Sequence, residues 1–255
     1  MKKLLFSVGI LLCAQSNAQQ NNEVESAEEQ KMNIIKSNVT AYAFRNINLS
    51  YERAITSWFS VNVGFGTMPE GEIPFSSSFL KGEAEKEIQN VKVGLTHFTV
   101  EPRFYIGKGY GKGFYFAPYF RHSNFSTNDF HFEYDYEAAP GISYTVPLTA
   151  KGKASGNSAG LMVGAQFFLN KKQNFVLDFW ILGAHYGSGN GDFTLVNALG
   201  RPLTPQEQQQ LKSELENLDI PMVKYKVTTN ANGADVALDG PWAGFRSGLS
   251  LGYRF

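Results

Sequence analysis

The chain ends with "SGLSLGYRF", residues 247–255, in which apolar residues alternate with small or polar ones up to the last position. One face of this segment is apolar: Leu249, Leu251, Tyr253 and Phe255. The other face is small or charged: Ser250, Gly252 and Arg254. A period of two is the mark of a β-strand with one buried face. The sequence therefore predicts that the chain closes on a regular strand.

The same alternation recurs in three earlier segments, "FSVNVGF" (59–65), "FTVEPRFYI" (98–106) and "LMVGAQF" (161–167). Each segment separates apolar residues from small and polar ones. The connections between these segments contain few helical patterns. Repeated half-apolar strands of this kind predict an antiparallel sheet.

The polar faces of these strands carry charges, which indicates what they face. Seven charged residues fall on the polar faces of these and the other alternating segments of the chain: Glu52, Glu101, Arg103, Arg121, Asp178, Arg246 and Arg254. Charges mixed with glycine and serine suit a narrow lumen, and the apolar faces would then contact lipid. We expect an all-β fold, a transmembrane antiparallel β-barrel. A soluble lipocalin-like barrel, with the apolar face inside, is the alternative.

The N-terminus has the pattern of an export signal. Lys2 and Lys3 precede an apolar run, and Ser16-Asn17-Ala18 forms a small-x-small cleavage site. We expect a signal peptide at 1–18 and a disordered periplasmic tether at 19–32. Removal of the two lysines leaves 21 basic and 23 acidic residues, a balance that gives no indication of nucleic-acid binding.

The spacing of the turns predicts the number of strands. Seven segments alternate, near 47–55, 58–66, 92–106, 113–126, 155–169, 174–187 and 242–255. Outer-membrane barrels have an even number of strands, short periplasmic turns and long outer loops. Residues 33–44 supply an eighth strand, with a tight turn at Arg45-Asn46. We expect a barrel over 33–255, with outer loops at 67–90, 127–154 and 187–241 and both termini in the periplasm.

The second outer loop contains a hairpin, residues 129–151. Its first strand, "DFHFEYDYE", has an acidic face and an aromatic face formed by Phe130, Phe132, Tyr134 and Tyr136. We expect Tyr136 to pair with Tyr144, and the aromatic face to continue the lipid-facing side as an extracellular contact surface. A one-residue change of phase then requires a bulge within 151–160. The acidic face could hold a divalent cation, but a solvated edge is favoured.

The third outer loop contains one helix, at 204–219. Thr204 is the expected N-cap, Pro205 occupies the first helical position and Glu207 completes a capping box. Leu211, Leu215 and Leu218 form one apolar stripe. We expect this helix to be a second contact surface.

The sequence offers little support for an enzyme. His122 and Ser123 are adjacent, whereas the His-x-Ser-Asn stretch of lipid A deacylases places its histidine and serine on one strand face. No cofactor motif or metal-ligand spacing is present, so no catalytic, cofactor or metal residues are predicted. The charges of the lumen are expected to pair as a plug; a narrow solute pore is the alternative.

Four stretches carry a resemblance to a known family: 38–55, 100–121, 175–193 and 249–255. Together they resemble a family of small outer-membrane β-barrels of unknown function from Bacteroidota, with an architecture similar to the OmpA and OmpX barrels. The resemblance implies an eight-stranded outer-membrane barrel without an established activity. We expect a non-enzymatic structural or interaction role in the cell outer membrane. The expected partners are outer-membrane lipid, lipopolysaccharide, another envelope protein and the barrel-assembly machinery. Tyr253 and Phe255 resemble the C-terminal signal that this machinery reads.

Overall fold

The computed structural model describes residues 30–75, 91–139, 141–217 and 222–255. The chain divides into two units, Met1–Lys31 and Met32–Phe255. The second unit contains all the strands described below. The predicted signal peptide, nearly all of the predicted tether and residues 76–90 of the first predicted loop lie outside the described residues.

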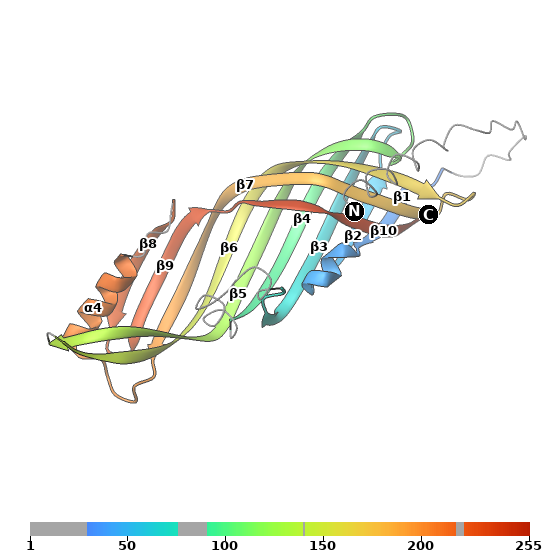
Figure 1. Cartoon of the computed structure of the whole chain (residues 1–255). Coiled ribbons are helices and arrows are strands. Elements are labelled where there is room, and N and C mark those ends of the chain that lie inside the picture. Colours follow the sequence, from blue (N-terminus) through green and yellow to red (C-terminus); the bar gives the residue numbers. More distant parts are fainter. Residues whose placement is uncertain (1–29, 76–90, 140, 218–221) are drawn as a thin grey trace, which may run out of the picture. The chain divides into compact units, whose positions relative to one another are not determined.

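Eight antiparallel strands form a closed barrel, as predicted (Figure 1). They are β1 (Asn33–Asn38), β2 (Ile47–Ala54), β3 (Phe59–Glu72), β4 (Lys92–Tyr105), β5 (Gly113–Ala139), β6 (Ile142–Leu169), β7 (Phe175–Asn197) and β10 (Gly244–Arg254). Strand β10 pairs with both β1 and β7, and this double pairing closes the barrel. Arg254 lies opposite Ile34 at one end, which we call the terminal end.

Strands β5, β6 and β7 are much longer than the others and continue beyond the opposite end of the barrel. Strand β6 has 28 residues and β1 has only 6. The extension is widened by β8 (Lys224–Asn230) and β9 (Gly233–Pro241), which pair with each other and with the end of β7. Helix α4 (Pro205–Glu216) packs on this extension (Figure 1). We call this extension the lobe. It consists of β5 from Phe130 onward, the parts of β6 and β7 that lie beside it, α4, β8 and β9.

The predicted bulge in the long hairpin exists, but its position differs from the prediction. Thr127 pairs with Gly152, whereas the next pair along the strands is Phe130 with Ala150, so the extra residue is in β5. The predicted pair of Tyr136 with Tyr144 is confirmed. A bulge changes the phase of the strand that contains it, so β5 exchanges its faces while β6 keeps one phase throughout.

The first hairpin also differs from the prediction. Strand β1 ends at Asn38, and a short 3₁₀ helix, η1 (Thr40–Phe44), precedes Arg45 with φ of 58°. The side chain of Asn38 accepts hydrogen bonds from Thr40 Oγ1 (2.7 Å) and from the backbone N–H of Ala41 (3.1 Å). These local bonds favour a helical turn over further strand, as asparagine side chains often do.

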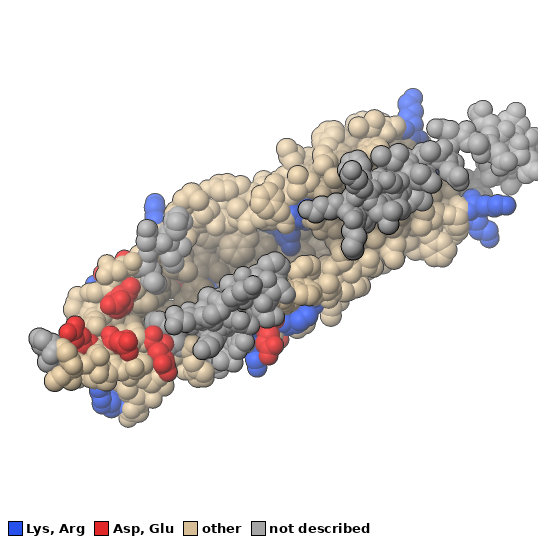
Figure 2. Space-filling model, viewed as in Figure 1, with Lys and Arg blue, Asp and Glu red and all other residues tan. Residues whose placement is uncertain are grey.

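The barrel is apolar outside and charged inside. Phe65, Phe114 and Leu161 point outward with 54%, 56% and 65% of their surface exposed. Glu52 and Arg103 point inward and are fully buried. In Figure 2 most of the visible surface between the two ends is uncharged, with a few charged side chains, and most of the visible acidic side chains gather at the end that carries α4. This arrangement inverts that of a water-soluble barrel.

The lobe has the opposite chemistry on the same sheet. Its buried core is apolar and joins the strands to the helix: Tyr134, Val146, Leu148, Ala150, Leu195, Leu203, Leu211, Leu215, Val227 and Ala234. Along β6, the inward face changes from Gln166 and Ser158 in the barrel to Leu148 in the lobe. The outward face changes in the other direction, from Leu161 to exposed Lys153. Both faces of the strand therefore exchange polarity between residues 161 and 148.

Candidate functional site

The barrel interior is closed by a four-residue ring of charges from four strands. Lys36 Nζ lies 2.5 Å from Glu52 Oε2 and 2.7 Å from Asp178 Oδ2. Arg103 Nη1 lies 2.7 Å from the same oxygen of Asp178 and 3.2 Å from that of Glu52. Each cation thus bridges both carboxylates. All four side chains are fully buried, so the pairs have little solvent screening.

The ring continues toward the lobe through one more carboxylate. Glu101 pairs with Arg103 Nη2 at 2.8 Å and, through its other oxygen, with Arg246 Nη1 at 2.6 Å. Three carboxylates thus meet three cations, which balances the charge of the network. Neutral groups complete it at the terminal end: Tyr105 donates to Glu52 (2.6 Å) and Tyr115 donates to Asp178 (2.8 Å). Buried charges require such partners.

The structure brings together five of the seven predicted lumen charges. They are Glu52, Glu101, Arg103, Asp178 and Arg246. Arg254 is buried at the terminal end, with its guanidinium 4.3 Å from the ring centre of Phe168. Arg121 has no ion pair among the described residues.

Sequence reasoning missed Lys36 and the two tyrosines of this network. Tyr105 shares the strand face of Glu101 and Arg103, because it lies two residues beyond Arg103, so the alternation already placed it inward. Lys36 is the one charge in the segment 33–38. A single lysine in an apolar strand could have been assigned to either face.

A cavity of about 350 Å³ lies on the lobe side of the network. Its lining includes amide, basic and aromatic side chains and one carboxylate, Glu101, which is paired with Arg246: Asn38, Asn46, Asn48, Asn62, His97, Glu101, Arg121, Trp180 and Arg246. The rings of Tyr119 and Trp180 each lie 4.7 Å from the guanidinium carbon of Arg246. Cation–π contacts of this kind hold a guanidinium in place.

The predicted loop helix and its capping box are confirmed. The backbone N–H of Glu207 donates to Thr204 Oγ1 (3.3 Å), and the Glu207 carboxylate accepts from the N–H of Thr204 (2.6 Å). Arg201 donates to both oxygens of Glu207, at 2.6 and 2.9 Å, and Tyr144 donates as well. The bonds from Arg201 hold the pKa of Glu207 well below its usual value of 4.5, although burial opposes this shift.

The aromatic face of the hairpin lies opposite to where the sequence placed it. Tyr134 is buried against α4 and donates to the backbone oxygen of Glu207 at 3.2 Å. Phe130 and Tyr136 pack against the same core. The prediction that these residues form an exposed contact surface is wrong, because the bulge in β5 turns them inward. Phe132 pairs with Leu148, and its side chain lies outside the described part.

The outward face of the hairpin is polar. It carries exposed His131, Glu133 and Asp135, and Asp135 accepts a hydrogen bond from Thr145 at 2.9 Å. Among the residues that the structure describes, no group of three potential metal ligands lies close enough to hold an ion. The outward face is therefore an exposed polar strand surface.

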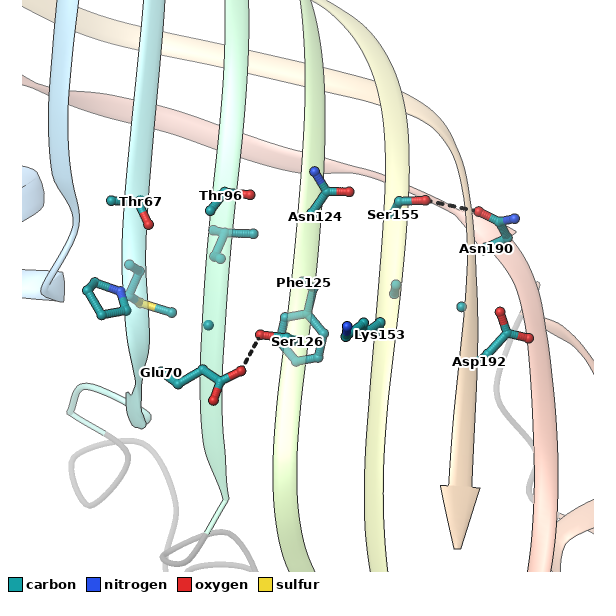
Figure 3. A pocket seen from close by; sticks show the side chains of 16 residues that line it. Thr67, Glu70, Thr96, Asn124, Phe125, Ser126, Lys153, Ser155, Asn190 and Asp192 are labelled. Carbon is teal, nitrogen blue, oxygen red and sulfur yellow. Dashed lines mark hydrogen bonds between the residues drawn. The ribbon is translucent and has the colours of Figure 1, made fainter.

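A polar belt crosses the outer wall where the apolar surface ends. Thr67, Thr96, Asn124, Ser155 and Asn190 form one row across five neighbouring strands, as Figure 3 shows. The next row contains charged residues: Glu70, Lys153 and Asp192. Glu70 accepts from Ser126 at 2.8 Å. These rows line a shallow depression of about 580 Å³.

The candidate catalytic pair does not form. His122 lies on the outer face of β5, where its Nδ1 contacts Asn157 Oδ1 at 2.9 Å. Ser123 is buried on the inner face. The strand backbone therefore lies between the imidazole and the hydroxyl. A general base must be within hydrogen-bond distance of its nucleophile, so these two residues do not form a catalytic pair.

The predicted assembly signal lies at the seam of the barrel. Tyr253 and Phe255 are exposed on the outer face at the terminal end. The backbone N–H of Phe255 donates to the carbonyl of Asn33 at 2.8 Å, and the reverse bond measures 3.0 Å. The last residue thus joins the first strand directly.

None of the described helices is long and apolar enough to cross a membrane. Comparison of the chain with protein-family models, with curated proteins and with solved structures finds no match. The resemblance to the Bacteroidota barrel family stays a prediction. The fold therefore defines the chain as an eight-stranded β-barrel protein.

Proposed function

We propose that this barrel is embedded in the bacterial outer membrane, with a sealed lumen and with the lobe presented outside the cell as a contact surface. The observation that carries the proposal is the exchange of polarity along the long strands. On β6 the outward face changes from Leu161 to Lys153, while the inward face changes from Ser158 to Leu148. Such an exchange suits a strand that leaves lipid and enters water.

The dimensions of the apolar band support this placement. Along β4 and the residue after it, the outward residues from Phe98 to Ile106 are mainly apolar, and the side chains of Phe98 and Ile106 are 46% and 77% exposed. Eight residue steps of a tilted strand cover roughly 20 Å along a barrel axis. Outer-membrane barrels have apolar bands of about 25 Å. Aromatic side chains gather at the terminal end of the band, where Phe104 and Phe116 stack with ring centres 4.9 Å apart.

The charge network favours a sealed lumen rather than an open pore. Lys36 and Arg103 contact carboxylates from opposite parts of the wall, β2 and β7. Eight strands leave a lumen barely wide enough for side chains. A network that is fully buried and hydrogen-bonded across this width is a plug. In a planar bilayer the protein is expected to give no steady current, and a stable open conductance would favour the pore.

The contact role rests on the surface that the lobe exposes. Its outward strand face carries Glu133 and Asp135, and α4 adds exposed Glu214 and Glu216. A photo-crosslinking residue at Asp135, in whole cells, should capture a protein or lipopolysaccharide. The same residue at Leu161 should capture only lipid. Identical adducts from both positions would contradict the proposal.

A further inference from the structure

The charges that face the lumen do not balance: two arginines lie outside the network, Arg254 at the terminal end and Arg121 at the cavity. The carboxylates Glu52, Glu101 and Asp178 are each engaged by two cations of the network. Arg121 points into the lumen from β5 beyond this network. Among the described residues, its guanidinium has no carboxylate within ion-pair distance and no hydrogen-bond acceptor. A cation in this position lacks the anionic partner that charges inside a protein usually have.

The neighbours of Arg121 increase this excess. Arg246 lines the same cavity, and the two guanidinium groups are close enough to repel each other. Arg246 itself is held by Glu101 and by the rings of Tyr119 and Trp180. It therefore keeps its position beside Arg121 without help from a ligand. Glu101 offsets the charge of Arg246, so the two guanidinium groups and this carboxylate leave one net positive charge at the cavity, which favours an anion.

The remaining lining supplies further polar groups. The Nδ1 atom of His97 is buried and has no hydrogen-bond partner among the described residues. The His97 ring lies over Gly66, where any side chain would collide with it. The amides of Asn38 and Asn46 reach the same space, whereas the Asn48 amide is already hydrogen-bonded to its neighbours. A buried polar atom without a hydrogen-bond partner points to a bound group that supplies the missing hydrogen bond.

We propose that this cavity binds a small oxyanion, a phosphate or carboxylate group carried by a solute, with Arg121 as its principal ligand. The guanidinium can donate two parallel hydrogen bonds to such a group. Arg246 supplies the second positive charge, and His97 and the amides offer hydrogen bonds at the sides. A volume of about 350 Å³ accommodates the oxyanion together with a small organic portion. Binding at this site depends neither on a lobe partner nor on the membrane.

The test is isothermal titration calorimetry of the barrel folded in a non-ionic detergent, with inorganic phosphate as the probe. We expect saturable binding at one site per chain. Arg121→Gln should weaken it by about tenfold or more, since a charge-assisted double bond is lost. Arg53→Gln is the matched control, because it removes an arginine from the outer face and should leave binding unchanged. Absence of saturable binding, or equal binding by Arg121→Gln, would overturn the proposal.

A second measurement applies if Arg121→Gln does not fold. The melting temperature of the wild-type barrel is compared in phosphate and in chloride at equal ionic strength. A ligand that binds the folded state raises the melting temperature, so we expect a higher value in phosphate. Arg121→Lys, which keeps the charge but loses the planar fork, should reduce this difference. Equal melting temperatures of the wild type in the two salts would contradict the proposal.

Discussion

The barrel and the lobe share three strands but have cores of opposite chemistry. Strand β6 contributes Gln166 to the barrel interior, where it accepts a hydrogen bond from Lys36 at 2.7 Å. On the same face, the strand contributes Val146 and Leu148 to the lobe core, both fully buried. The strand geometry is the same in both places. What differs is the medium that the other face is suited to contact: lipid for the barrel, water for the lobe.

This difference explains why the barrel tolerates buried ions. If the apolar residues face lipid, a narrow lumen is left with the polar residues of every strand, which meet across the axis. Burying an ion costs several kcal/mol unless partners offset it. Lys36 and Arg103 each contact two carboxylates, so the ring is fully paired. In the lobe, burial of apolar area by α4 stabilises the core instead.

The largest effect is expected from removing one charge of the ring. Arg103→Met retains much of the volume but leaves Glu52, Glu101 and Asp178 with too few cations. Such a loss destabilises by about 3–5 kcal/mol, and we expect most of the protein to fail to reach the heat-modifiable barrel form on gels. Arg53→Met, on the exposed outer face, is the control. Normal folding of Arg103→Met would show that the ring is dispensable.

A smaller effect is expected from a cavity in the lobe. Leu211 is fully buried between α4 and the sheet, and Leu211→Ala should destabilise the lobe by about 3 kcal/mol. Because the lobe core is separate from the charge network, the barrel should remain heat-modifiable while α4 becomes sensitive to limited proteolysis. Lys212→Ala, on the same helix, should change neither. Loss of the barrel form in Leu211→Ala would show that the two cores fold as one.

The lobe is also expected to respond to acid. The pKa of Glu207 is lowered in the folded state, so its contribution to stability is present above its usual pKa of 4.5 and is lost as the pH falls below that value. Relative to the intrinsic exchange rate at each pH, hydrogen exchange of α4 should therefore accelerate between about pH 6 and about pH 3. In Glu207→Gln, exchange should be faster at neutral pH, and this acceleration should be reduced. An unchanged pH profile in Glu207→Gln would assign the effect to other groups.

The capping hydroxyl should matter less. Thr204→Ala removes the side-chain acceptor for the N–H of Glu207, a loss of about 1 kcal/mol. The expected result is a modest increase in hydrogen exchange at the first turn of α4, with no change in the barrel strands. A uniform increase over β1–β4 would contradict the separation of the two parts.

The sequence predicted the strands well, since most of each wall segment alternates with a period of two, although bulges interrupt β3, β5 and β7. It did not predict the face of the hairpin aromatics. Phe130, Tyr134 and Tyr136 share the even phase of Phe114 and Phe116, and only the two residues of the bulge separate the two phases. Nothing local in "TND" at 127–129 marks that extra residue. Contacts with α4, about 70 residues away along the chain, determine which face is buried.

The charge network shows the same limit. Alternation placed Glu101 and Arg103 on one inward face, because both lie on a single strand. The partnership of Lys36 with Asp178, however, depends on closure of the barrel across 142 residues. Arg121 shares the inward phase but pairs with no carboxylate in the part of the chain that the structure describes. A strand pattern thus predicts which side chains face the lumen, but only the three-dimensional register determines which of them pair.

The position of the lipid boundary on β6 is measured most directly with single spin-labelled cysteines in vesicles. Cys13 is the one natural cysteine and lies in the predicted signal peptide, so the mature chain provides a clean background. Labels at Leu161 and Val163 should be accessible to oxygen dissolved in lipid, and labels at Lys151 and Lys153 to a water-soluble nickel complex. The crossover should fall near Asn157. Equal access of the nickel complex to Leu161 and Lys153 would contradict a membrane-embedded barrel.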